Sequence, residues 1–200
     1  GVRIVQDTWK VVVGKMERGE HKVPSYTVQE VVYFDAPRDF IKGVRRAQQE
    51  YYSKAIDESF MPLLPKMDKF RKVNGRPWIE QYLYYYLGHS HLKRGLAEKK
   101  DSAEARKYFQ MLLDKVPETR FVFEAYMGIA ESWELERRFA KAADAYLDAR
   151  KAFRKLEKSD RRMSLPQRRV ILRLERLAGL YRADMIRAQG KNQLAKTEYE

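Results

Sequence analysis

The sequence predicts a mainly α-helical protein whose helices follow a short N-terminal β-meander. Three observations support this fold class. Residues 1–36 are rich in Val, Ile, Tyr and Trp, which favour strands. From Pro37 onward, apolar residues recur every three to five positions, as on one face of a helix. Within this helical part, one set of small and aromatic residues recurs after 37 positions. We therefore expect a β-meander over 1–36 and a helical repeat domain over 37–200.

The N-terminal part contains three segments that favour strands: VRIV, WKVVVGKM and EVVYF. Turn residues separate them at positions 6–8 and 17–20, and Pro24 marks a further break. We expect these segments to form the meander. Their order loosely resembles the end of a small SH3-like or Sm-like barrel.

The helical part divides at proline residues and at capping residues. An apolar face from Phe40 to Phe60 predicts the first helix, which Pro62 and Pro65 should end. Asp101 and Glu104 have the spacing of a capping box, and Ser164 with Gln167 forms another. The further helices are expected over residues 78–96, 101–116, 121–135, 140–158, 164–187 and 192–200.

The set of residues that recurs is clearest in the middle of the chain. The pattern Y-x2-I-A-x2-W begins at Tyr126 and is followed by A-x3-Y-x2-A beginning at Ala142. The set Ala105, Phe109 and Leu112 lies 37 positions before Ala142, Tyr146 and Ala149. We expect the best units at 78–117 and 121–158 and a partial unit at 164–200. The alternative is a helical bundle without repeats.

These spacings resemble the tetratricopeptide repeat (TPR), in which two antiparallel helices pack through small residues in fixed places. The resemblance implies an α-solenoid. It also implies a non-enzymatic scaffold that binds a partner protein or copies of itself, with a filament or ring subunit as an alternative. Two stretches, residues 76–95 and 117–133, are also similar to the TPR arrays of bacterial envelope proteins. The chain has no cysteine, so we favour a periplasmic or envelope location over a cytoplasmic one.

TPR geometry further implies which side chains line the concave, partner-binding groove. We expect an aromatic end, an acidic middle and a mixed far end. The alternative for the tyrosines is that their rings pack on the β-meander. The expected groove residues are Tyr82, Tyr85, His89, Lys93, Glu124, Met127, Glu131, Glu134, Glu175 and Arg182.

The sequence offers little support for catalysis, for a cofactor or for a small-molecule substrate. It contains no phosphate-binding loop, nucleophile elbow or dinucleotide-binding motif. Because His89 and His91 are two positions apart on a helix, their side chains diverge, and we expect them to be structural. The absence of cysteine excludes disulfides and thiolate zinc sites.

The net charge of +13 is unevenly distributed. Residues 36–77 carry 10 basic and 5 acidic residues, and residues 158–200 carry 11 and 5. Such a field favours acidic partners, anionic lipid or nucleic acid. We favour a solvated face, or one that docks on an acidic protein, over a phosphate-binding one. The expected basic patch comprises Arg161, Arg162, Arg168, Arg169, Arg173 and Arg176.

Overall fold

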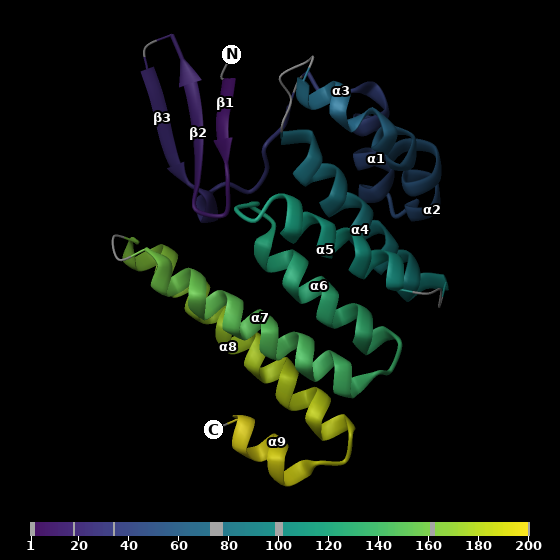
Figure 1. Cartoon of the computed structure of the whole chain (residues 1–200), viewed down its shortest axis with the longest axis vertical. Coiled ribbons are helices and arrows are strands. Elements are labelled where there is room, and N and C mark those ends of the chain that lie inside the picture. The colour runs from purple at the N-terminus through teal and green to yellow at the C-terminus, as the bar shows by residue number, and fades with distance from the viewer. Residues whose placement is uncertain are drawn as a thin grey trace. The chain divides into compact units, whose positions relative to one another are not determined.

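The computed structural model describes residues 3–17, 19–33, 35–72, 78–98, 102–160 and 163–199. The chain is mainly helical and has a small three-stranded sheet near its N-terminus (Figure 1). It forms two compact units, Gly1–Phe121 and Val122–Glu200, and each is described by itself. The sheet belongs to the first unit together with the helices up to residue 115.

The sheet consists of β1 (Arg3–Asp7), β2 (Val11–Met16) and β3 (Gly19–Pro24), paired antiparallel in the order β1-β2-β3. The first two predicted strands are present, but β1 continues through Gln6 and Asp7, which were expected in a turn. The third prediction is wrong, because residues 30–33 are not a strand and β3 lies earlier. Gly19 has a φ of 124°, which a glycine adopts readily, and it allows the chain to return at once beside β2.

The single helix predicted over residues 40–60 is divided in the structure. α1 (Arg38–Gln48) ends before Glu50, whose φ is 64°, and α2 (Tyr52–Ala55) follows. The chain then continues through a π-helical turn, Ile56–Phe60, and a 3-10 stretch, Met61–Lys66, into α3 (Met67–Lys72). Pro62 does not end the helical path, because it lies at the start of the 3-10 stretch, where its missing N–H matters little.

α4 (Trp78–Glu98) and α5 (Ala103–Lys115) pack against each other, and α4 also contacts α1, α2 and α3. A Cβ added to Gly88 would lie 2.8 Å from the ring of Phe109. The two helices therefore approach closely at this glycine. Asp101 of the expected capping box lies outside the described residues, and Ser102 occupies the N-cap position without a side-chain capping bond.

The second unit consists of α6 (Val122–Leu135), α7 (Phe139–Ser159), α8 (Leu165–Ala188) and α9 (Asn192–Tyr199). Each helix packs on the next one along the chain (Figure 1). The Ser164 hydroxyl oxygen accepts a hydrogen bond from the backbone N–H of Gln167, which is one of the two bonds of the predicted capping box. No helix among the described residues is long and apolar enough to cross a membrane.

The two sets of residues separated by 37 positions have the same environment in their two units. All six side chains are almost completely buried, and the aromatic ring is the bulky member of each set. Phe109 lies against Gly88, and Tyr146 belongs to a buried cluster with Ala130. Each helix pair thus buries a large ring together with a small residue of the preceding helix.

Candidate protein-binding surfaces

The groove residues expected on α4 face the interior of the first unit more than its surface. Tyr82 is only 5% exposed. Tyr85 is half-buried and stacks on Phe121, with ring centroids 4.0 Å apart. His89 lies 5.8 Å from the Tyr85 ring, and Lys93 is half-buried. For Tyr82 the structure matches the alternative, in which the ring packs inside the unit beside the strands.

Tyr82 belongs to a buried polar network centred on Asp7, at the end of β1. The hydroxyls of Tyr82 and Tyr33 both donate to Asp7 Oδ2, at 2.7 and 3.1 Å. Arg120 Nη1 lies 3.3 Å from Asp7 Oδ1, and both side chains are more than nine-tenths buried. Burial raises the pKa of Tyr82 above its usual value, and the charge of Asp7 adds to this effect. The hydroxyl therefore stays protonated and acts as a donor.

The same network joins β1 to the loop before α6. Arg120 Nη2 donates to the Val28 carbonyl at 3.0 Å, and the Gln81 side chain donates to the Asp7 carbonyl at 3.0 Å. The Gln81 oxygen accepts from the Thr119 hydroxyl at 2.9 Å. We call Asp7, Tyr33, Gln81, Tyr82 and Arg120 the Asp7 network. It fastens the sheet to α4 through charge and hydrogen bonds.

The expected acidic middle of the groove lies on one face of α6. Glu124, Met127, Glu131 and Glu134 follow at three- and four-residue steps along this helix, so they share a side of it. Glu124 is exposed and the other three are half-buried. Glu134 accepts a hydrogen bond from the Tyr146 hydroxyl at 3.1 Å. We call these four residues the α6 face.

The expected far end of the groove is occupied by ion pairs within the second unit. Arg150 and Arg154 of α7 both donate to Glu175 Oε1, at 2.9 and 2.6 Å. Burial alone would raise the pKa of Glu175, but these hydrogen bonds outweigh it and lower the pKa. Arg182 pairs with Glu198 of α9. Glu175 and Arg182 therefore tie α8 to its neighbours.

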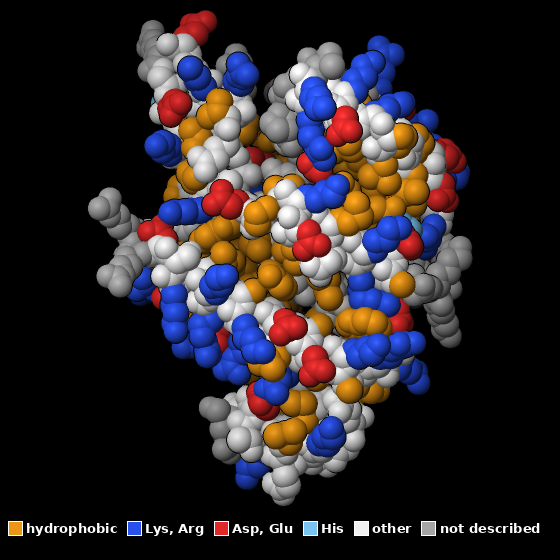
Figure 2. Space-filling model, in the orientation of Figure 1, with side chains coloured by type: hydrophobic (Ala, Val, Ile, Leu, Met, Phe, Trp, Pro, Cys, Tyr) orange, Lys and Arg blue, Asp and Glu red, His pale blue; other side chains and the backbone are white. Residues whose placement is uncertain are grey.

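The expected basic patch is divided by the structure. Arg161 and Arg162 lie outside the described residues, and Arg168 pairs with Glu157 of α7 at 3.1 Å. Arg169, Arg173 and Arg176 are exposed on α8. Exposed cations also line α7, where sequence analysis placed no patch. We call the exposed cations Lys151, Arg154, Lys155, Lys158, Arg169, Arg173 and Arg176 the basic surface. Figure 2 shows Lys and Arg side chains gathered over α7 and α8.

The two histidines of α4 have structural surroundings. His91 is buried, stacks on Tyr108 at 5.4 Å and accepts a hydrogen bond from Arg94 at Nδ1. Burial lowers its pKa to about 4, and Arg94 contributes in the same direction. Burial also lowers the pKa of His89, as does Lys93. Among the residues described, no three His, Asp or Glu side chains gather in a way that could hold a metal ion.

His91 predicts that the first unit loses stability in mild acid. The pKa of His91 in the folded protein lies below the unfolded value of 6.5. The free energy of unfolding of the first unit therefore keeps its full value above pH 6.5. It falls as the pH drops from 6.5 towards 4, by on the order of 1–3 kcal/mol. Amide hydrogen exchange of α4 and α5 at pH 7 and 4.5 measures this loss. His91→Gln should flatten the dependence, whereas the exposed His21→Gln should leave it unchanged. Equal slopes in all three proteins would contradict the prediction.

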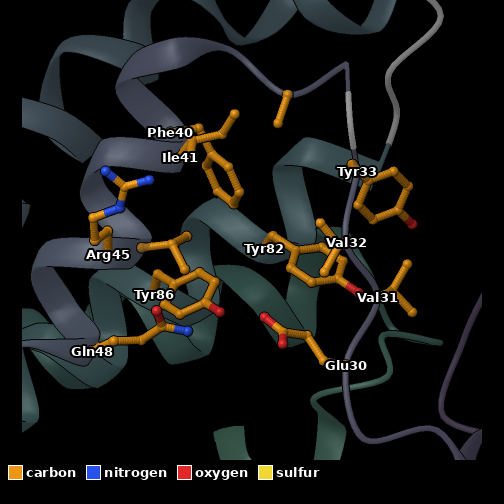
Figure 3. Close-up of a pocket in the computed structure, with 12 residues that line it drawn as sticks. Glu30, Val31, Val32, Tyr33, Phe40, Ile41, Arg45, Gln48, Tyr82 and Tyr86 are labelled. Carbon is orange, nitrogen blue, oxygen red and sulfur yellow. The ribbon is translucent and has the colours of Figure 1, made fainter.

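A pocket that sequence analysis missed lies in the first unit between α1 and residues 30–33. Its volume is about 220 Å³. Phe40, Ile41 and Val44 of α1 form one wall, and Tyr82 and Tyr86 of α4 also line it. Figure 3 shows α1 on one side of this α1 pocket and residues Glu30 to Tyr33 on the other. Two signals pointed to it: the apolar face of α1, and a strand-like segment, EVVYF, just before that helix.

Comparison with known proteins gives no relative. No protein-family model, curated protein or solved structure matches the chain.

Proposed function

We propose that the chain is a non-enzymatic, TPR-like helical scaffold that binds a partner protein. One observation carries the proposal: the large-on-small packing of Phe109 on Gly88 is matched 37 residues later by Tyr146 in a cluster with Ala130. Helix pairs that repeat a packing contact in this way stack into α-solenoids, whose usual role is to present binding surfaces.

The α6 face is the surface that we assign to the partner. It carries three carboxylates on one side of a helix, of which Glu124 is exposed, and Met127 is half-buried against the cluster that contains Tyr146. A flexible thioether adapts to apolar surfaces, and rim charges guide the approach of a partner. The face therefore suits a partner segment that is basic and partly apolar.

Charge reversal on the α6 face tests the proposal. A photo-cross-linker placed at Met127 should capture a defined partner in the native host. We expect Glu124→Lys combined with Glu131→Lys to abolish this cross-linking. The matched control is Asp144→Lys combined with Asp148→Lys, which makes the same charge change at exposed positions of α7. Circular dichroism should show that both variants stay folded. Equal cross-linking in the two variants would remove the α6 face from the proposal.

The basic surface favours a second candidate function, the binding of an anionic polymer or lipid. Seven exposed cations lie on two helices, α7 and α8, that pack against each other. If they contact phosphates, affinity for a 20-nucleotide single strand should fall about 10³-fold or more between 50 and 200 mM salt. Lys151→Gln, Lys155→Gln and Lys158→Gln together should reduce the slope of log affinity against log salt. An absence of binding at the lower salt concentration would rule out this candidate for nucleic acid.

A further inference from the structure

The segment Gln29–Val32 overlaps the strand-like sequence EVVYF but has no strand partner. Val31, Val32 and Tyr33 are residue types that favour strands. Among the described residues, no backbone hydrogen bond joins Gln29, Glu30, Val31 or Val32 to another segment. Backbone donors and acceptors that lack a partner make a segment a template for an added strand.

Both ends of this segment are fixed. At one end, Arg120 donates to the Val28 carbonyl. At the other end, the Tyr33 ring stacks on Trp78, with centroids 3.8 Å apart and planes inclined by 7°, and its hydroxyl bonds to Asp7. The segment is therefore held in place before any ligand arrives. A fixed template reduces the ordering entropy that binding must overcome.

Apolar surface lies exposed beside this template. Val32 is 62% exposed and Ile41 is 42% exposed, and both line the α1 pocket. Figure 3 shows Ile41 on the α1 side of the pocket and Val32 on the opposite side. The volume of about 220 Å³ is below the 300–1,000 Å³ typical of small-ligand sites, so it suits one or two side chains.

We propose that an extended peptide segment of the partner binds along Gln29–Val32 as an added β-strand and places an apolar side chain in the α1 pocket. Main-chain hydrogen bonds would supply affinity, and the pocket would select the side chain. An extended peptide fits better than a small molecule, because it can pair with several N–H and C=O groups of the segment at once. This inference rests on the proposed protein-binding function and assigns it a second contact, separate from the α6 face.

The test uses the whole chain and a phage-displayed library of random twelve-residue peptides, from which a selected peptide is synthesised with a fluorescent label. Enriched peptides should carry apolar residues at alternating positions. On binding, the amides of Gln29–Val32 should gain protection from hydrogen exchange. Two further copies of the peptide carry N-methyl groups, one on the odd and one on the even residues. One of the two should bind about tenfold more weakly or worse, because it loses the N–H groups that pair with the segment.

Two variants locate the contact. Val32→Pro removes one backbone N–H and favours an extended backbone at Val31, and it should weaken the peptide about tenfold. Val32→Thr keeps the N–H and should bind nearly as the original does. Ile41→Arg should block the pocket, whereas Gln49→Arg adds the same side chain at an exposed position outside it.

The outcomes separate this inference from the proposed function. Selection of helical peptides, or binding that survives both Val32→Pro and Ile41→Arg, would overturn the added strand. A dimer that Val32→Pro dissociates, seen by light scattering, would assign the template to a second copy and overturn a foreign peptide. If cross-linking at the α6 face persists while no peptide binds here, the scaffold function stands and only this inference fails.

Discussion

Replacing Arg120 with methionine should lower the free energy of unfolding of the first unit by about 3–5 kcal/mol. The substitution leaves the Asp7 carboxylate buried, with its side chain only 3% exposed, and removes its cationic partner. It also removes the hydrogen bonds to the Tyr82 hydroxyl and the Val28 carbonyl. Hydrogen exchange of β1, β2 and α4 measures the loss locally, which suits a chain with two compact units.

Two controls make this result interpretable. Lys107→Met breaks the Lys107–Glu104 pair, whose side chains are 56% and 46% exposed, and should cost less than about 1 kcal/mol. Adding Asp7→Asn to Arg120→Met should recover part of the loss, because the unpaired charge disappears. A loss below about 1 kcal/mol in Arg120→Met alone would show that the Asp7 network does not hold the sheet in place.

The Asp7–Arg120 pair also shows what the sequence could not reveal. The two residues are 113 positions apart, and no local pattern connects them. Helices, in contrast, carry local signals, and the predicted extents of α4, α6, α7 and α8 agree with the structure to within about two residues. The break at Glu50 was missed, because a positive φ in a non-glycine residue has no reliable signal in a single sequence.

The strand predicted at EVVYF failed for a similar reason. Propensity favours a strand there, but a strand also needs a backbone partner, and no backbone hydrogen bond joins residues 29–32 to the edge strands β1 and β3. The groove residues were chosen from helix spacing, which gives the side of a helix but not what covers it. Three predicted groove residues therefore lie on the expected side of their helices but already have polar partners within the protein. These pairs are Tyr82 with Asp7, Glu175 with Arg150, and Arg182 with Glu198.

Replacing Phe109 or Tyr146, the two rings separated by 37 positions, with alanine should lower the local free energy of unfolding of its helix pair by about 3–5 kcal/mol. Phe109→Ala should raise hydrogen exchange in α4 and α5, and Tyr146→Ala should do so in α6 and α7. Both rings are at most 2% exposed, so each substitution leaves a cavity. Gln110→Ala and Asp144→Ala, at exposed positions on the same helices, should change stability by less than about 0.5 kcal/mol.

A double-mutant cycle tests whether Phe109 and Gly88 share one space. Gly88→Ala should cost about 1–3 kcal/mol, because the new methyl group would lie 2.8 Å from the ring. In a Phe109→Leu background that cost should fall by about 1 kcal/mol or more, since a smaller side chain leaves room for the methyl group. Additive effects would mean that the helices separate instead of colliding. The close approach of α4 and α5 would then not depend on a small residue, and the repeat interpretation would lose its main support.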